Sequence, residues 1–313
     1  MSARARIRAA AYAGGWAAVR RMPPGLTAAA FRAGGSFAAR RGGKGVTQLR
    51  RNLARVVAAT PALAGTDLDE LTRDAMHSYA RYWQEVFRLE SMRIEDVVAA
   101  TYTEGEELLR GAYAEGNGLI LALPHCGNWD QAGAWLAATG IRFTTVAERL
   151  EPAPVFDRFV AFRQGLGMEV VPLTGGAAPF EVLADRLRDG RTLCLLADRD
   201  LPGSGREVSF FGEPAPMPVG PALLAIRTGA PLLPVTLSFD DPAPWNARIH
   251  PRIADPGTGS LADRVVAMTQ ATADRFAAAI ARRPQDWHML ARFWSADRGP
   301  ASGGVVPAES VRA

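Results

Sequence analysis

The stretch "LILALPHCGNWDQAGAWL", residues 119–136, joins an apolar run to a helix-like segment through a polar turn. The run at 119–123 has the length and composition of a buried strand, and Asn128 is a residue that commonly caps the start of a helix. His125 and Asp130 therefore stand where a strand ends and a helix begins. This junction decides the interpretation of the fold, because the rest of the chain repeats it.

Strand-like and helix-like segments alternate after residue 116. We expect strands at 119–123, 142–146, 168–172, 192–197 and 232–238, and helices near 129–139, 154–165, 179–189 and 219–228. This alternation predicts an α/β fold whose largely parallel central sheet is covered by helices. Ligands of such sheets bind beyond the carboxyl ends of the strands, which is where His125 lies.

A helical N-terminal region precedes the sheet. Pro23, Pro24 and the cluster "RRGGKG" break the first 50 residues into short helical pieces. Three further helices are expected, a long one at 67–89, another at 261–282 and a short one at 284–294. The predicted organisation is amphipathic N-terminal helices at 1–50, an α/β domain at 51–298 and a disordered tail at 299–313.

The first helix carries an aromatic face. Tyr12, Trp16 and Val19 are spaced by four and three residues, with arginines towards both ends of the segment. Such a helix can lie in an anionic membrane interface, with the arginines near the lipid phosphates and the aromatic rings just below them. The alternative is an amphipathic helix packed on the protein core, and the segment alone does not decide between them.

Composition limits the classes of partner. A chain of 313 residues with 48% apolar residues builds a substantial core, and its net charge of +4 favours anionic partners. The sequence has no nucleic-acid-binding signature, no apolar run long enough to cross a membrane and no segment that reads as a secretory signal. Cys126 and Cys194 lie in or beside apolar runs, so we expect reduced thiols in the cytosol.

Local chemistry leaves the role of His125 open. Turn hydrogen bonds could satisfy it, and Asp130 could serve only the first turn of its helix, where the helix dipole stabilises a carboxylate. A second strand-end cluster, "ADRD", supplies Asp198. If the two strands are neighbours, Asp198 can fix the tautomer of His125 and raise its basicity, which makes a general base without a serine nucleophile.

Other chemistries have weaker support in the residues. Cys126 is the nearby covalent nucleophile candidate, but adjacent residues at a strand end point apart, so we interpret it as packing. Metal binding by His125, Asp130 and Asp198 lacks the spacing of known zinc motifs, and no metal is expected. Four arginines are candidates for binding phosphate groups, namely Arg149, Arg163, Arg199 and Arg206.

The segment "HCGNWD" matches the H-x4-D motif of glycerophospholipid and lipid A acyltransferases. Further matches follow in the family's order: "TVAERL" at 145–150, "FRQGLGMEVVPLTGG" at 162–176, "LLADRDL" at 195–201 and "VSFFGEPAPMPVGPALLAIRTGAPLLPV" at 208–235. From about residue 10 to 294 the chain resembles the lipid A lauroyl/myristoyl acyltransferase superfamily. In particular, it resembles the actinobacterial phosphatidylinositol mannoside acyltransferases, the PatA group.

The resemblance implies a glycerolipid-acyltransferase-like fold and a peripheral enzyme on the cytoplasmic face of the inner membrane. It implies transfer of a fatty acyl chain, palmitoyl in our interpretation, from acyl-CoA as co-substrate to the 6-hydroxyl of a mannose on phosphatidylinositol mannosides. No bound cofactor, no metal and no covalent intermediate are implied. The expected partners are acyl-CoA, the glycolipid acceptor and an anionic membrane surface, and not nucleic acid.

By motif, His125 resembles the general base and Asp130 its motif partner. Glu148 and Arg163 resemble active-site or substrate-contact residues. Asp198 stands where the family carries the carboxylate that orients the histidine, although we expect glutamate there in the mycobacterial pattern. The shorter side chain leaves the contact distance to be established.

Three alternatives remain at this point. One is an acyltransferase with another acceptor, such as a lysophospholipid or a different glycolipid. Another is a metal-dependent hydrolase that uses the His/Asp cluster. The last is an inactive lipid-binding protein, which the basic amphipathic N-terminus suggests.

Overall fold

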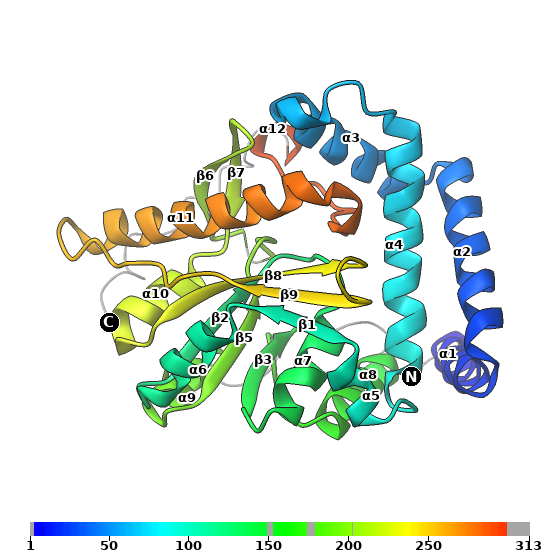
Figure 1. The fold of residues 1–313 in the computed structure, drawn as a ribbon, viewed down its shortest axis with the longest axis horizontal. Helices are drawn as coiled ribbons and strands as arrows, with labels where there is room; N and C mark the ends of the chain where they lie inside the picture. The colour runs from blue at the N-terminus through cyan, green and yellow to red at the C-terminus, as the bar shows by residue number, and fades with distance from the viewer. Residues whose placement is uncertain (1–2, 149–152, 174–178, 202, 299–313) are drawn as a thin grey trace.

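A seven-stranded sheet forms the centre of the molecule, in a computed structural model that describes residues 3–148, 153–173, 179–201 and 203–298 (Figure 1). Its strand order is β1-β9-β8-β2-β5-β3-β4. Every neighbouring pair is parallel except β8–β9. The strands are β1 (Thr101–Glu104), β2 (Leu119–Leu123), β3 (Phe143–Ala147), β4 (Met168–Pro172), β5 (Thr192–Leu196), β8 (Leu232–Phe239) and β9 (Trp245–Ile249). The predicted α/β fold with a largely parallel sheet is confirmed.

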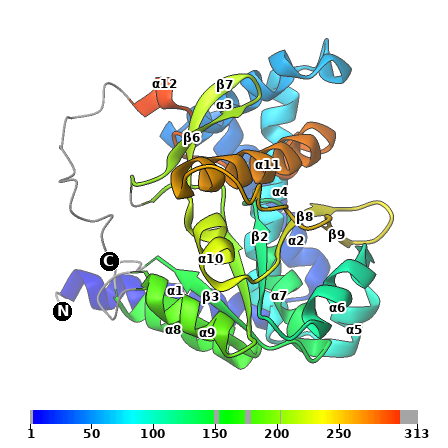
Figure 2. The same ribbon diagram turned by 90° about the vertical axis from the view of Figure 1, so that its left-hand side faces the viewer.

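Both faces of the sheet are covered because successive side chains of a strand point to opposite faces. On β2, Ile120 and Ala122 pack with α9 (Pro179–Arg188), α10 (Gly220–Thr228) and α11 (Leu261–Arg282). Leu121 and Leu123 point the other way and pack with α6 (Glu106–Ala114) and α7 (Trp129–Ala138). Figure 2 shows the two helical layers on either side of the sheet. The central strands are therefore apolar on both faces, as parallel strands in such folds are.

The N-terminal region is helical, as predicted. It consists of α1 (Ala3–Arg21), α2 (Pro24–Arg41) and α3 (Lys44–Ala59), and a short turn of 3-10 helix, η1 (Pro61–Leu63), leads to the long helix α4 (Leu68–Leu89). Figure 1 shows α2 lying along the outer side of α4. The two helices approach closely at Gly35, where a Cβ atom would lie 2.8 Å from the Met76 carbonyl oxygen. The proposed boundary near residue 50 stays a prediction.

The aromatic face of α1 packs on the protein, which decides between the two interpretations of that face. The Trp16 side chain is 2% exposed. Its ring centroid lies 5.1 Å from that of Phe87 and 5.3 Å from that of Phe159. Tyr12 joins the same cluster. The Trp16 ring is therefore part of the core, Tyr12 packs against it, and the interpretation of this face as packed on the protein is the one that holds.

Several elements differ from the prediction. The segment at 284–294 is not a helix: after a single 3-10 turn, η2 (Pro284–Asp286), Trp287 forms a β-bridge and the chain is irregular up to Trp294. Strands β1 and β9 extend the sheet beyond the predicted strands. Helices α5 (Ile94–Ala99) and α6, and the hairpin of β6 (Arg206–Phe210) and β7 (Glu213–Met217), were also not predicted. The remaining elements are α8 (Ala153–Gly165) and α12 (Ser295–Arg298), and the tail at 299–313 lies outside the described residues.

Candidate active site

The neighbouring strands β2 and β5 bring His125 and Asp198 together. Their register pairs Leu123 with Leu196, so the residues two positions further on each strand lie opposite each other. The Nδ1 atom of His125 lies 2.5 Å from Oδ1 of Asp198, and the backbone amide of His125 donates to Oδ2 at 2.9 Å. The shorter aspartate side chain thus reaches the histidine.

This arrangement leaves one imidazole nitrogen for chemistry. The Asp198 side chain is fully buried, whereas the His125 side chain is 21% exposed. Because the carboxylate accepts a hydrogen bond from the Nδ1–H group, Nε2 is the unprotonated nitrogen of the neutral ring. Burial alone would raise the pKa of Asp198, but the charge of His125 and the hydrogen bonds from its ring and amide lower it. Asp198 is therefore an anion that orients a base.

The turn that carries His125 has a backbone that suits glycine. Gly127 has φ 57°, and a Cβ atom there would lie 3.0 Å from Cβ of Leu237. Asn128 then caps α7, with its Oδ1 atom accepting from the Gln131 amide at 3.0 Å. The strand, turn and cap predicted from the sequence are all present.

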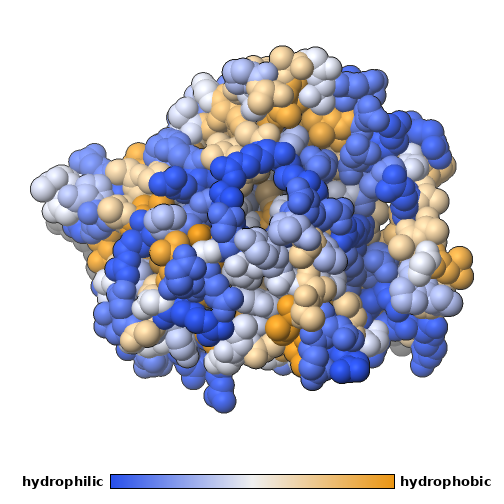
Figure 3. Space-filling view, in the orientation of Figure 1, coloured by the Kyte–Doolittle hydropathy of each residue, from blue (hydrophilic) through white to orange (hydrophobic). Residues whose placement is uncertain are grey.

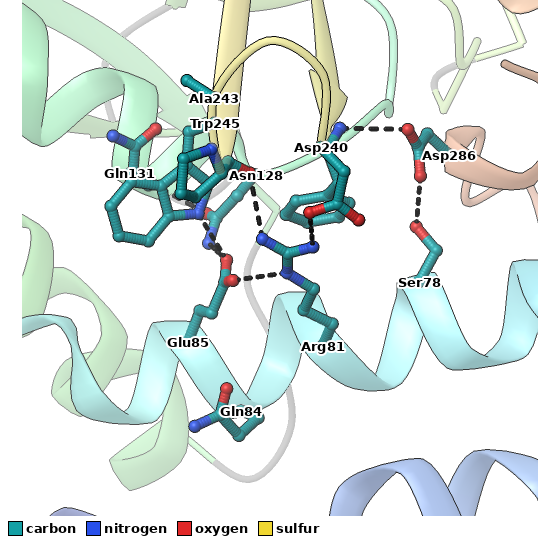
Figure 4. A network of polar contacts seen from close by, with 12 residues as sticks. Ser78, Arg81, Gln84, Glu85, Asn128, Gln131, Asp240, Ala243, Trp245 and Asp286 are labelled. Atoms are coloured by element: carbon teal, nitrogen blue, oxygen red, sulfur yellow. Dashed lines mark hydrogen bonds and ion pairs between the residues drawn. The ribbon is translucent and has the colours of Figure 1, made fainter. Parts of the chain in front are cut away.

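Helix α4 fastens this turn from the side (Figure 4). Glu85 accepts hydrogen bonds from Asn128 Nδ2 and from Trp245 Nε1, each at 2.8 Å. Arg81 pairs with Glu85 at 2.7 Å and also with Asp240 in the loop after β8. The cap of α7 is therefore tied to both α4 and the β8–β9 hairpin.

Asp130 has different partners from those of Asp198. Its carboxylate is 1% exposed and pairs with the Arg163 guanidinium, with Nε to Oδ1 at 2.7 Å and NH2 to Oδ2 at 3.2 Å. The Tyr82 hydroxyl donates to Oδ2 at 2.8 Å. Burial alone would lower the pKa of Arg163, but the Asp130 charge raises it. Asp130 thus holds α7 against α8 and α4, and within the described part of the chain it makes no hydrogen bond to His125.

Cys126 does not point to covalent catalysis. It is 4% exposed, and burial, together with the charges of Asp198 and Asp286, raises the pKa of its thiol. A neutral buried thiol is a poor nucleophile. The interpretation of Cys126 as a packing residue agrees with this environment.

An apolar cavity lies between the sheet and α7. Trp129 and Asp130 are among its lining residues, and the Trp129 ring centroid lies 5.4 Å from that of His125. Leucines from β2, β5 and β8 form much of the wall, with Phe143 and Met168 from the starts of β3 and β4. The volume of the cavity in this structure is about 70 Å³.

The other predicted substrate contacts fall into three groups. Arg163 lines the apolar cavity and is paired with Asp130. Glu148, Arg199 and Arg206 are exposed, with Arg199 directly after the dyad aspartate and Arg206 on β6. Arg149 lies outside the described residues. Among the described residues, no three or more His, Cys, Asp or Glu side chains are grouped to hold a metal ion.

Sequence reasoning missed two residues of the site: Tyr82 on α4, which contacts Asp130, and Trp287 after η2, which contacts Asp198. The Trp287 indole donates from Nε1 to Oδ2 of Asp198 at 3.1 Å. Tyr82 lies on the apolar face of a predicted helix, where nothing distinguishes it from core. Trp287 was assigned to a helix, so its approach to the turn had no signal in the local pattern.

Comparison with known proteins places this geometry in a family. The model of the bacterial lipid A biosynthesis acyltransferases matches residues 2–296. A phosphatidylinositol mannoside acyltransferase of Mycolicibacterium smegmatis is 51% identical over 287 residues, which cover 91% of each chain. Proteins of the same name from two strains of Mycobacterium tuberculosis, CDC 1551 and H37Rv, are 49% and 48% identical over 290 residues, which cover 92% of this chain and 88% of each relative. The chain belongs to the bacterial lipid A biosynthesis acyltransferase family, in the group of the phosphatidylinositol mannoside acyltransferases.

Proposed function

We propose that this acyltransferase moves a fatty acyl chain, palmitoyl as the preferred one, from acyl-CoA to the 6-hydroxyl of a mannose on phosphatidylinositol mannosides. The observation that carries the proposal is the His125–Asp198 pair, whose imidazole packs beside Trp129, a residue that lines an apolar cavity. The names of the relatives support the acceptor. Acyl-CoA is a co-substrate, and no bound cofactor takes part.

His125 acts as the general base in this mechanism. Its Nε2 atom removes the proton of the sugar hydroxyl as the oxygen bonds to the thioester carbonyl carbon. Asp198 holds the ring and stabilises the imidazolium that forms. When the carbon–sulfur bond breaks, the imidazolium returns the proton to the leaving thiolate, so no acyl-enzyme is needed. The first-turn amides of α7 at Trp129 and Asp130, which have no acceptors within their helix, are the proposed donors to the developing oxyanion.

The cavity supplies a place for the acyl chain. Its walls are mostly apolar side chains from the sheet and α7, and the ion pair Asp130–Arg163 also lines it. A chain lying in it has its thioester end beside Trp129, which contacts the His125 ring. Arg199 and Arg206, both exposed and without ion-pair partners in the part of the chain that the structure describes, are candidates for the CoA phosphates. Arg149 and Glu148 remain candidate substrate contacts from the motif.

A membrane surface is the proposed working place, on the cytoplasmic face of the inner membrane as a peripheral protein. The first acidic residue of the chain is Asp67, whereas arginines occur throughout the preceding segment, so this region suits anionic lipids. Among the described residues, no helix has the length and apolar character needed to cross a bilayer.

Helix α2 supplies the apolar part of this surface. Leu26, Ala30, Ala33 and Phe37 follow one another on one helical face, and Leu26 and Phe37 are 56% and 58% exposed. Figure 3 shows apolar side chains at the edge where Figure 1 places α2. This face replaces the aromatic face of α1, which is buried.

Vesicle flotation tests the membrane surface. Leu26→Ser and Phe37→Ser should each weaken binding to vesicles containing anionic lipid about tenfold, because each removes apolar area from the interface. Leu261→Ser, at a leucine that is 42% exposed on α11, is the matched control and should leave binding unchanged. Equal losses in all three variants, or binding that is indifferent to salt and anionic lipid, would contradict the proposed surface.

An acceptor assay tests the function itself. Purified protein is incubated with labelled palmitoyl-CoA and, side by side, mono- and dimannosylated phosphatidylinositol, a lysophospholipid and another glycolipid. We expect labelled mannoside lipid and little of the other products. Transfer mainly to a lysophospholipid would replace the acceptor, and absence of transfer to every acceptor would reject the enzyme assignment.

A further inference from the structure

The segment after η2 lies against the catalytic turn as a second strand would. Cys126 and Trp287 form an antiparallel bridge. The Gly127 amide donates to the Asp286 carbonyl at 3.0 Å, and the His288 amide donates to the His125 carbonyl at 2.8 Å. Main-chain hydrogen bonds to residues 286–288 therefore hold the backbone of the turn that carries His125 in place.

The segment is itself anchored on both sides. Asp286 accepts from the Ser78 hydroxyl of α4 at 2.8 Å and from the Phe239 amide of β8 at 3.0 Å. The His288 ring lies 2.9 Å from the same serine oxygen. Because the Ser78 proton goes to Asp286, His288 Nε2 must donate to that oxygen. Figure 4 shows Ser78 and Asp286 facing each other across this joint.

Among the described residues of 286–288, Trp287 is the one whose side chain donates a hydrogen bond to the Asp198 carboxylate. Its indole is 0% exposed and packs with Phe210, Phe293 and Trp294, at centroid distances of 5.2–5.9 Å. That packing leaves the ring little freedom, so the direction of its N–H bond is fixed. The N–H points at Oδ2 of Asp198, whereas Oδ1 faces His125 Nδ1.

We infer that Trp287 is a positioning residue of the acyl transfer reaction, which holds the Asp198 carboxylate in the orientation that presents His125 Nε2 to the acceptor hydroxyl. The inference rests on the proposed function, because it assigns the residue a role in that reaction. Trp287 touches neither substrate nor the reacting atoms in this account. Its effect on transfer passes through Asp198.

The test compares two buried tryptophans of the same cluster. Trp287→Phe keeps an aromatic ring but removes the N–H donor to Asp198. Trp294→Phe makes the same change at an equally buried indole, whose N–H donates at 3.0 Å to the Phe210 carbonyl instead. We expect Trp287→Phe to lower kcat about 10- to 100-fold with little change in the KM for acyl-CoA, since a hydrogen bond to a charged group is lost. We expect Trp294→Phe to lower the unfolding free energy about as much as Trp287→Phe does, because each loses one buried hydrogen bond. Its kcat should stay within about threefold of wild type.

A double-mutant cycle separates positioning from general damage. In an Asp198→Ala background, Trp287→Phe should have almost no further effect on kcat, because the residue through which it acts is absent. An effect of the same size in both backgrounds would overturn the inference, as would a kcat of Trp287→Phe equal to that of wild type. Neither result bears on the proposed function, which the acceptor assay tests with the wild-type protein alone.

A second measurement covers the case in which Trp287→Phe does not fold. In protein labelled with 15N-tryptophan, the Trp287 indole resonance should shift strongly in Asp198→Asn, while the Trp294 indole should stay in place. An unchanged Trp287 resonance would show that the indole does not hold the carboxylate, and the inference would be wrong.

Discussion

Asp198 at the end of β5 and Asp130 in the first turn of α7 are both buried, but they have opposite kinds of partner. Asp130 faces a permanent cation, the Arg163 guanidinium, together with the Tyr82 hydroxyl. Asp198 faces an imidazole and the Trp287 indole. Because an arginine does not lose its proton in proteins, the Asp130 pair keeps its charges through a reaction. Of the two pairs, the Asp198–His125 pair is the one whose charge can change, because His125 can gain a proton during the reaction and lose it again.

The largest effect separates the two aspartates in kinetics. Asp198→Asn should lower kcat about 10²- to 10⁴-fold, because the amide neither stabilises the imidazolium nor fixes the required tautomer. Steady-state transfer of labelled acyl groups measures it. If Asp130→Asn lowers kcat more than Asp198→Asn while both proteins remain folded, the division of roles is reversed.

The next effect separates them in stability. Asp130→Asn leaves the Arg163 charge buried without its counter-ion, which costs about 3–5 kcal/mol of unfolding free energy. Urea denaturation of the wild type and of the two asparagine variants provides the comparison. Arg163→Met in the Asp130→Asn protein should restore part of the loss, since it removes the uncompensated charge. A change in unfolding free energy below about 1 kcal/mol in Asp130→Asn would mean that the Asp130–Arg163 pair does not hold α7 against α8.

The contrast also shows what a sequence can reveal about this site. The apolar runs predicted β2 and β5 and placed His125 and Asp198 at their ends, so the pair was expected if the two strands were neighbours. The structure supplied that adjacency and its register. The partners of Asp130 could not follow in this way, because they lie on the helices α8 and α4, and helix packing has no register rule that pairs given side chains as strand pairing does. Trp287 was misassigned for a related reason: its segment is held extended by the turn at Cys126, and no local pattern encodes that pairing.

The edge of the sheet was missed for another physical reason. β1 is short and half exposed, with the sequence "TYTE", and it lacks the apolar run by which the central strands were recognised. β9 follows β8 through a tight connection and alternates polar with apolar residues. The aromatic face of α1 had two valid interpretations, and the cluster with Phe87 and Phe159 decided for packing.

A smaller effect concerns the scaffold beneath the dyad. Burial, with the charge of His125, lowers the pKa of His288 to about 3. Below about pH 6.5 His288 is protonated in the unfolded chain but stays neutral in the folded protein. The free energy of unfolding therefore decreases as the pH falls from about 6.5 to about 3. His288→Gln should therefore remove about 2 kcal/mol of the loss in unfolding free energy between pH 7 and pH 5. Parallel pH dependences for the variant and the wild type would show that this ring titrates normally.

The smallest effect is expected at Cys126, which lies between His125 and Gly127 but has a raised thiol pKa. Cys126→Ala should leave kcat within about threefold and lower stability by about 1 kcal/mol, since it removes a small buried group. Intact-mass analysis during turnover should find no acylated protein. An acyl group trapped on this cysteine would mean that transfer proceeds through a covalent enzyme intermediate.

The most direct measurement of the central claim is the rate of labelled acyl transfer by His125→Ala, with the unfolding midpoint measured on the same preparation. The imidazole is the base in this account and contributes little to packing at its exposed edge. We predict a 10²- to 10⁴-fold loss of kcat in a protein that still folds, with a lower unfolding midpoint because the buried Asp198 carboxylate loses its main partner. Near-normal transfer by His125→Ala would contradict the account, because the Asp198–His125 pair would then not be the catalytic one.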